Sequence, residues 1–381
     1  MPMADGCKRR LQKIAFVIST LEPGGAERVA VTLCNAWVRS GLDVDLITME
    51  LPDAVSHYPL DPAIQVHRLN SIRNSPNIFS ALARNAARVK TLRNTIRDVR
   101  PDIVVSFTSN MSSLVLPATR GLGIPVVAAE RSHPQYIAIS WQRHLLRDLT
   151  HRMADRVVVQ SEAVREWYQK NLKIDGVVIP NPIDLGAFAS LPARTFDQDN
   201  GVIVSVGRLD DWKGHDTVID AFAVLAPRFP GWRLEIYGKG PSGQAFGDRI
   251  AAHGLQNRIH LKGVSDRIPD ILSAADVFIF GSRYEGYPNA VIEALAAGCP
   301  VVATDCPGAT AEILGGGEHG VLVPVDDVNA MAQALIELIE SPERRQRLSA
   351  LGPKAVAPLA TETISQRWLD LFEDIIKQRS A

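Results

Sequence analysis

Short apolar runs alternate with longer amphipathic stretches along most of the chain. Helical patterns cover about 26–40 and 77–99. Continuous Val/Ile runs are typical of parallel strands buried on both faces, so the alternation predicts an α/β fold with a doubly wound parallel sheet. In the first half, the apolar runs bounded by turn residues are 13–19, 43–49, 64–69, 102–107, 125–130 and 156–161.

The pattern pauses between residues 179 and 201, which are rich in Pro, Asp and Gly, and then starts again. Such composition without a long periodic segment is typical of a linker. We therefore expect an N-terminal domain over 1–183, a linker over 184–200 and a C-terminal domain over 201–362. The apolar runs of the second half are 201–207, 233–238, 258–263, 276–281, 300–305 and 320–325.

A final helix is expected over about 363–378. It carries Trp368, Leu371, Phe372 and Ile375 on one face. An apolar stripe of this kind needs a surface on which to pack.

Composition narrows the class of protein. The 381 residues carry a net charge of −1, which does not favour nucleic-acid binding. Cys7, Cys34, Cys299 and Cys306 form no C-x-x-C pair, so neither a metal site nor a disulfide framework is indicated, and we expect a reducing cytoplasm. The N-terminal apolar core, 14–18, is too short for a signal peptide or a membrane span.

Two loops offer groups that suit a diphosphate, and both follow a predicted first strand, where open α/β sheets bind ligands. In "LEPGGAER", Gly24 and Gly25 expose backbone at a helix N-terminus, although a plain strand-to-helix turn would look the same. In "GRLDDWKG", Arg208 and Lys213 follow Gly207 and supply two cations. The competing interpretation is two solvated surface charges.

The segment "YGKGPSG" (237–243) contains the pattern G-x-G-x-x-G after a strand. A dinucleotide fingerprint expects an acidic residue about twenty positions further, at the end of the next strand. Asp266 lies near that position but beyond Gly263, in a loop. An NAD-dependent oxidoreductase is therefore a disfavoured alternative.

Two further groups of polar residues are candidates in the first half. "AERSHPQY" places Glu130, Arg131 and His133 after a strand, where the histidine could orient a sugar hydroxyl or phosphate or could simply be a satisfied surface residue. On the 77–99 helix, Arg93 and Arg97 share a face with Lys90 and Arg100. This basic face could meet acidic headgroups or an acceptor diphosphate, or it could only be solvated.

The stretch "RYEGYPNAVIE" (283–293) ends a strand and opens a helix at Pro288. We expect the N–H groups of 289–291 to be unpaired and available to an anion. Glu285 and Glu293 flank that position, and carboxylates are good acceptors for hydroxyl groups. The spacing therefore suggests one glutamate for a ribose, one for a sugar and the helix N-terminus for a diphosphate between them.

Four segments in this order, "GGAER", "GRLDDWKG", "EGYPNAVIEALAAGCPVVATD" and "GVLV", resemble the retaining glycosyltransferases of family 4. The resemblance covers nearly the whole chain and is strongest over 201–325. It implies the GT-B fold, with two Rossmann-like domains facing a cleft and the final helix (363–381) completing the N-terminal domain. By the same resemblance, the N-terminal domain would bind the acceptor and the C-terminal domain the nucleotide sugar. It also implies transfer with retention of configuration and without a metal, so the Asp-x-Asp of 43–45 is interpreted as part of a strand.

The same resemblance implies roles for individual residues. Arg208 and Lys213 would neutralise the leaving diphosphate, and Glu285 would contact the donor sugar. Where relatives carry a histidine directly after the strand, this chain has "ERSHP", so His133 takes that catalytic role unless Glu130 or Arg131 replaces it. The implied acceptor-binding residues are Glu130, Arg131, Arg93 and Arg97. The implied donor-binding residues are Gly24, Gly25, Gly207, Gly238, Val264, Gly286, Tyr287, Pro288, Asn289, Ala290, Val291 and Glu293.

The expected function is that of a hexosyltransferase. It would move a hexose or N-acetylhexosamine from a nucleoside-diphosphate sugar, with uridine favoured over guanosine, to a lipid-linked or glycan acceptor in bacterial cell-surface polysaccharide synthesis. No cofactor, metal or nucleic acid is expected. The expected place is the cytoplasm, with peripheral contact to the anionic inner face of the membrane. A nucleotide-sugar epimerase of the same fold is the alternative, and it would turn over the donor with no acceptor present.

Overall fold

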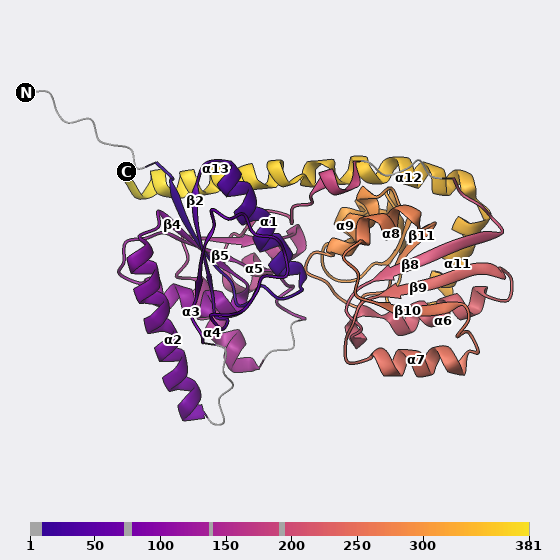
Figure 1. Cartoon of the computed structure of the whole chain (residues 1–381), viewed down its shortest axis with the longest axis horizontal. Helices are drawn as coiled ribbons and strands as arrows, with labels where there is room; N and C mark the ends of the chain where they lie inside the picture. Colours follow the sequence, from indigo (N-terminus) through magenta and orange to yellow (C-terminus); the bar gives the residue numbers. More distant parts are fainter. Residues whose placement is uncertain (1–9, 72–77, 137–139, 190–194, 381) are drawn as a thin grey trace, which may run out of the picture. The chain divides into compact units, whose positions relative to one another are not determined.

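The computed structural model describes residues 10–71, 78–136, 140–189 and 195–380, and of 78–83 and 380 it describes the backbone alone. The chain divides into two compact units (Figure 1). Unit 1 comprises Met1–Pro182 and Thr361–Ala381, and unit 2 comprises Ile183–Ala360. Cys7 and Asn77, at which the sequence analysis placed a cysteine and a helix start, lie outside the described residues.

Unit 1 is built on a parallel sheet of seven strands in the order β3-β2-β1-β4-β5-β6-β7. The chain reverses direction of travel across the sheet between β1 and β4, which makes this the topological switch point. The six predicted runs each contain a strand, and β7 was missed because it has only two residues. The strands are β1 (Lys13–Val17), β2 (Asp43–Thr48), β3 (Gln65–Arg68), β4 (Ile103–Phe107), β5 (Val126–Ala129), β6 (Arg156–Val159) and β7 (Val177–Val178).

The last helix packs within unit 1, as its apolar face requires. The Trp37 ring of α1 lies 6.3 Å from that of Trp368 and 5.5 Å from that of Phe372. Leu371 is only half-buried, whereas Ile376, which the sequence analysis did not select, is buried. The helices of unit 1 are α1 (Gly25–Arg39), α2 (Ile78–Val99), α3 (Ser109–Thr119), α4 (Trp141–His151), α5 (Glu162–Leu172) and α13 (Thr361–Ser380).

Unit 2 is built on a parallel sheet of six strands in the order β10-β9-β8-β11-β12-β13. Its strands are β8 (Asn200–Val206), β9 (Gly231–Tyr237), β10 (Ile259–Gly263), β11 (Val277–Phe280), β12 (Val301–Thr304) and β13 (Val321–Val323). Its α-helices are α6 (His215–Leu225), α7 (Gly243–Ala252), α8 (Ile268–Ala274), α9 (Asn289–Ala296), α10 (Thr310–Ile313), α11 (Val328–Glu340) and α12 (Pro342–Val356). Its 3₁₀ turns are η1 (Leu185–Phe188), η2 (Asp211–Lys213), η3 (Gly315–Gly317) and η4 (Ala357–Leu359). The two sheets confirm the α/β class and its parallel, doubly wound strands.

The start of the expected linker belongs to unit 2. Leu185 and Phe188, on η1, pack against the apolar core of that unit. The Asp184 carboxylate accepts a hydrogen bond from the Gly186 N–H at 2.9 Å and so fixes the beginning of the turn. Two apolar side chains are enough to anchor a segment whose composition otherwise indicates a loop. Residues 190–194 of the expected linker lie outside the described residues.

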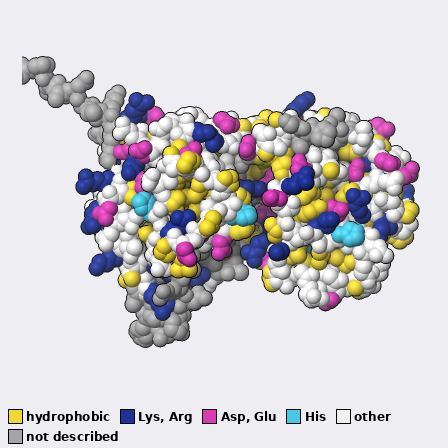
Figure 2. Space-filling model, in the orientation of Figure 1, with side chains coloured by type: hydrophobic (Ala, Val, Ile, Leu, Met, Phe, Trp, Pro, Cys, Tyr) yellow, Lys and Arg dark blue, Asp and Glu magenta, His cyan; other side chains and the backbone are white. Residues whose placement is uncertain are grey.

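The surface carries both signs of charge. Figure 2 shows basic and acidic side chains interspersed over the visible face of both units, in keeping with the net charge of −1. Within the described ranges, none of the helices combines the length and the apolar character that crossing a membrane requires.

Candidate functional site

The loops that follow β8 and β11 meet through two glycines at the carboxyl edge of the unit 2 sheet. Gly214 has φ 63°, in the left-handed region, and a Cβ there would collide with the Gly281 carbonyl oxygen. Only glycine allows both the backbone conformation and this approach. The contact brings the loop that carries Lys213 against the loop that carries Glu285.

Lys213 and Glu285 form an ion pair at this edge. The Lys213 Nζ lies 2.5 Å from the Glu285 Oε1, and the Ser282 hydroxyl donates to the same oxygen at 2.7 Å. The ammonium group also lies 5.8 Å from the centre of the Phe280 ring. The structure therefore joins the residue predicted for the diphosphate to the residue predicted for the sugar, and their opposite charges hold each other in place.

Arg208, the second predicted cation, has different partners. Its Nε lies 2.7 Å from the buried Asp210 carboxylate, and its guanidinium lies 5.7 Å from the Trp212 ring centre. The side chain is 67 % exposed. Trp212 in turn stacks on Tyr284, with ring centres 6.4 Å apart. The guanidinium is thus oriented by an acid and an aromatic face while remaining open to solvent.

Two residues of this region were missed by the sequence analysis. Arg283 bonds Asp216 at 2.8 Å and Asp326 at 2.9 Å, and the hydrogen bonds with Asp216 are the largest cause of its raised pKa. His215 is buried, with Nε2 3.2 Å from the Arg208 carbonyl oxygen, and burial followed by the charge of Lys213 lowers its pKa to about 4. His215 is therefore neutral at pH 7 and supports the loop of Arg208. Arg283 is the first residue of the quoted stretch 283–293, and His215 directly follows the quoted stretch 207–214, which is the signal that could have found them.

The start of α9 corrects one expectation. The Val291 N–H donates to the Pro288 carbonyl oxygen at 3.0 Å, so it is not available to an anion. Pro288 is the N-cap residue, and its carbonyl accepts the first bond of the helix, as cap carbonyls do. Glu293 is buried on the second turn of this helix, and Tyr287 belongs to the apolar core of unit 2.

The glycine-rich segment serves backbone packing. Gly238 has φ 147°, and a Cβ there would collide with the Gly207 carbonyl oxygen. Next to it, the Leu209 N–H donates to the Lys239 carbonyl at 3.1 Å. These glycines let the loops after β8 and β9 approach each other, which explains the motif without a dinucleotide. Val264, a predicted donor contact, follows β10 and is exposed.

In unit 1, Glu130 and Arg131 are buried, and each has hydrogen-bond partners inside the unit. Glu130 is 1 % exposed and accepts hydrogen bonds from the Ser109 hydroxyl and from the Tyr168 hydroxyl, the latter at 3.0 Å. Arg131 donates to Asn181 at 2.9 Å and lies 4.2 Å from the Phe107 ring centre. These partners make both residues internal supports of the loop after β5, not groups exposed to an acceptor.

His133 belongs to the same loop and is also buried. Its ring centre lies 4.8 Å from that of Tyr136, and its Nδ1 accepts from the Gln135 N–H at 3.4 Å. Burial lowers its pKa and outweighs the opposing charge of Glu130. The ring is therefore neutral at pH 7, which suits hydrogen bonding better than proton donation.

The other predicted residues of unit 1 have partners within it. Gly24 is the N-cap of α1, and its carbonyl accepts from the Tyr58 hydroxyl at 3.2 Å. The Glu27 carboxylate stands so close that a Cβ on Gly24 would collide with it, and burial raises the pKa of Glu27. The N-terminus of α1 thus already has an acidic group beside it, the carboxylate of Glu27.

The two arginines of α2 differ from each other. Arg93 donates to the carbonyl oxygens of Ala118 and Arg120, at 2.9 and 2.7 Å, and so caps the end of α3. Arg97 is exposed and lies 3.2 Å from Asp98. Of the two, only Arg97 projects freely enough to meet a surface.

Two compact units, each built on a parallel α/β sheet, are the architecture of the GT-B class of folds. A family model described as Glycosyltransferase Family 4 matches residues 23–187, and one described as Glycosyl transferases group 1 matches residues 190–355. The chain belongs to the glycosyltransferases of family 4. It is therefore a glycosyltransferase.

Known proteins resemble the chain over nearly its whole length. An uncharacterised glycosyltransferase of Haemophilus influenzae is 25 % identical over 94 % of this chain and 99 % of its own. An N-acetylgalactosamine-N,N'-diacetylbacillosaminyl-diphospho-undecaprenol 4-alpha-N-acetylgalactosaminyltransferase of Campylobacter jejuni is 28 % identical, over 88 % and 92 %. Among solved structures, HepE of Anabaena in complex with UDP and glucose matches with a TM-score of 0.78 at 20 % identity, over 94 % and 99 %.

Proposed function

We propose that this glycosyltransferase moves a sugar from a UDP-sugar to a lipid-linked acceptor in bacterial cell-surface polysaccharide synthesis, with retention of anomeric configuration. The observation that carries the proposal is the Lys213–Glu285 ion pair at the carboxyl edge of the unit 2 sheet. HepE, which shares the fold, was solved with UDP and glucose. The Campylobacter relative is named for an acceptor on diphospho-undecaprenol.

The ion pair gives the donor two groups at once. A bound diphosphate would compete with Glu285 for the ammonium of Lys213. Glu285, released in part from that charge, would then accept hydrogen bonds from the hydroxyls of the donor sugar. The pair would thus keep each group positioned and satisfied until a donor supplies both partners.

Departure of the diphosphate is the expensive step. As the bond from the anomeric carbon to the diphosphate oxygen breaks, negative charge grows on that oxygen, and Lys213 and the exposed Arg208 would stabilise it. The acceptor hydroxyl would bond to the same face of the sugar and pass its proton to the departing phosphate. We include metal independence in the proposal, because the two cations would compensate this charge without a metal ion.

The test is thermal unfolding with UDP, GDP, ADP and NAD. A ligand at a hundred times its dissociation constant adds about 2.7 kcal/mol, which raises the unfolding temperature by several degrees. We expect stabilisation by UDP that the double variant Arg208→Ala/Lys213→Ala abolishes. Stabilisation by NAD alone, or a UDP effect that survives both substitutions, would contradict the proposal.

Turnover separates the two activities that a UDP-sugar site allows. A transferase consumes UDP-sugar only with an acceptor, apart from slow hydrolysis. Under this proposal, the rate of this enzyme should also be unchanged when EDTA is added. Conversion of the donor to another UDP-sugar without any acceptor would indicate an epimerase instead.

A further inference from the structure

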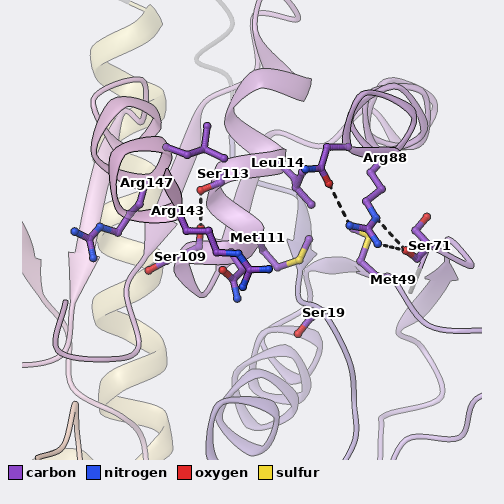
Figure 3. Close-up of a pocket in the computed structure, with 13 residues that line it drawn as sticks. Ser19, Met49, Ser71, Arg88, Ser109, Met111, Ser113, Leu114, Arg143 and Arg147 are labelled. Carbon is purple, nitrogen blue, oxygen red and sulfur yellow. Dashed lines mark hydrogen bonds between the residues drawn. The ribbon is translucent and has the colours of Figure 1, made fainter. Parts of the chain in front are cut away.

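A cavity of about 290 Å³ opens at the carboxyl edge of the unit 1 sheet (Figure 3). Residues that follow β1, β2, β3 and β4 line it, so it lies at the switch point between β1 and β4, where open α/β sheets bind ligands. Helices α2, α3 and α4 contribute the rest of the wall.

Two arginines give this cavity a positive charge. The Arg88 guanidinium donates to the Ser71 carbonyl oxygen at 2.7 and 3.0 Å and to the Asn85 side chain at 3.2 Å, which fixes it at the wall. Arg143, on α4, is exposed, and its guanidinium has no hydrogen bond or ion pair within the described part of the chain. Arg147 also lines the cavity, but its charge is paired with Asp148 at 2.7 Å.

The remaining polar groups suit the oxygens of an anion. Ser19 and Asn110, which carry a hydroxyl and an amide group, line the same cavity as the two arginines. None of the described residues that line the cavity is acidic. Thr108, the N-cap of α3, has φ 84°, a strained conformation for a β-branched residue, and the lining residues Ser109, Asn110 and Met111 follow it directly. Guanidinium and hydroxyl groups are the groups that bind phosphate. Of the lining residues, Ser109 and Arg147 are already engaged by the carboxylates of Glu130 and Asp148.

The cavity continues into an exposed apolar helix face. Trp141, Leu145 and Leu149 succeed one another at every fourth position of α4, and their exposed fractions are 70 %, 51 % and 58 %. Leu146 lines the cavity and is exposed as well, which joins the two surfaces. An exposed apolar helix face beside a cation, here Arg143, is typical of a surface that contacts a lipid with an anionic headgroup.

We propose that this cavity binds the phosphate or diphosphate of a lipid-linked acceptor and that the apolar face of α4 contacts its hydrocarbon chain. The proposal rests on the proposed function, because a lipid-linked acceptor is the second substrate of the transferase proposed above. Arg143 and Arg88 hold the phosphate oxygens, and Leu145 and Leu149 contact the first isoprenoid or acyl carbons. A phosphate on a hydrocarbon tail is the one ligand that uses both surfaces.

The probe for the test is farnesyl diphosphate, with inorganic pyrophosphate and farnesol as its two halves, bound to the full-length protein in a calorimeter. We expect the intact probe to bind more tightly than either half. Arg143→Ala should weaken the binding of farnesyl diphosphate and of pyrophosphate about 10- to 100-fold, since a hydrogen bond to a charged group is lost. Leu145→Ser/Leu149→Ser should weaken only farnesyl diphosphate and leave pyrophosphate unchanged.

Matched variants guard against general effects. Arg39→Ala removes another exposed arginine of unit 1, and Val55→Ser removes another exposed apolar side chain, so both should bind the probe like wild type. Equal binding of farnesyl diphosphate by wild type and Arg143→Ala would overturn the proposal. So would a loss seen only on phosphatidylglycerol vesicles, since that outcome indicates a general acidic surface.

UDP binding distinguishes this proposal from the proposed function. Arg143→Ala should keep its stabilisation by UDP, and Lys213→Ala should keep its affinity for farnesyl diphosphate. If Lys213→Ala lost the probe, the diphosphate would be binding at the unit 2 edge and the cavity proposal would be wrong. If UDP failed on the wild type while the probe behaved as expected, the donor assignment alone would fail.

Discussion

The candidate sites at the carboxyl edges of the two sheets differ in how their charges are balanced. At the edge of unit 2 each predicted cation is matched to an acid, Lys213 to Glu285 and Arg208 to Asp210. At the edge of unit 1 the cavity holds Arg88 and Arg143 without an acidic lining residue among those described. The same topology therefore carries one charge-balanced site and one cationic site.

The supports of the two edges differ as well. In unit 2, glycines at 214 and 238 let loops approach until their backbones touch. In unit 1, the buried carboxylate of Glu130 holds the loop after β5 through side-chain hydrogen bonds. A balanced, closely packed edge suits a small ligand that exchanges partners with the protein. An open cationic edge beside an apolar helix suits a larger ligand that carries both an anionic group and a hydrocarbon chain.

The largest effect is expected from breaking the balanced pair. Lys213→Ala removes a cation that stabilises the departing diphosphate and leaves Glu285 without it, so kcat should fall about 10²- to 10³-fold. Release of UDP from a UDP-sugar in the presence of acceptor measures the rate. Lys239→Ala removes an exposed lysine from the neighbouring loop and should change the rate little. Similar losses for both variants would show that charge at Lys213 has no special role.

A second prediction concerns the contact that creates the pair. Gly214→Ala forces a Cβ against the Gly281 carbonyl at positive φ, which should lower the free energy of unfolding by about 1–3 kcal/mol and slow transfer. Chemical denaturation followed by circular dichroism measures this change. Gly247→Ala, on α7 with open space around it, should be neutral or stabilise by up to about 1 kcal/mol. A neutral Gly214→Ala would mean that the two loops can separate freely.

A third prediction uses the titration of His215. Its folded pKa of about 4 lies below the unfolded value of about 6.5, so the unfolded chain binds more protons between them. The associated stability is full above the unfolded pKa and is lost as pH falls toward the folded pKa, by about 2 kcal/mol between pH 7 and pH 5. Urea unfolding at both pH values should show a smaller loss in His215→Gln than in wild type.

The control for that measurement is His144→Gln, which removes a half-buried histidine of unit 1. Its unit 2 transition should depend on pH as in wild type. An identical pH dependence in His215→Gln and wild type would exclude His215 as the origin.

The smallest effect is expected on α2. Arg97 is exposed and, within the described ranges, its one ion pair is with its neighbour Asp98. Arg97→Glu should therefore weaken binding to phosphatidylglycerol vesicles by about fivefold for each unit of charge. Co-sedimentation measures the bound fraction, with Arg39→Glu as the control. If the two variants lose equal binding, the effect is one of net charge and α2 does not face the membrane.

Much of the fold was predictable because its signals are local. A parallel strand buried on both faces needs a continuous apolar run, and such runs marked six of the seven strands of unit 1. The remaining strand, 177–178, is too short to give a pattern. The linker was misplaced at its start because Leu185 and Phe188 are only two apolar residues in a polar stretch, and only packing shows that they are buried.

The sequence predicts which polar residues follow the strands, but it does not predict how they pair. The sequence places Lys213 and Glu285 in loops after parallel strands, whose carboxyl ends share an edge. Which acid meets which cation depends on the approach of Gly214 to Gly281, which no local pattern encodes. The burial of Glu130 and Arg131 likewise depends on partners far along the chain, such as Tyr168 and Asn181.

The amino-acid sequence by itself determined the alternation of strands and helices, the division into two α/β halves and the set of polar residues at strand ends. Periodicity and turn residues act over a few neighbours, so they can be recognised without knowing the rest of the molecule. The tertiary structure alone decided which charges are paired, which are buried, and that Arg88 and Arg143 share a cavity beside the apolar face of α4. Those properties depend on distances between residues far apart in the chain, and only the packed sheets and helices fix such distances.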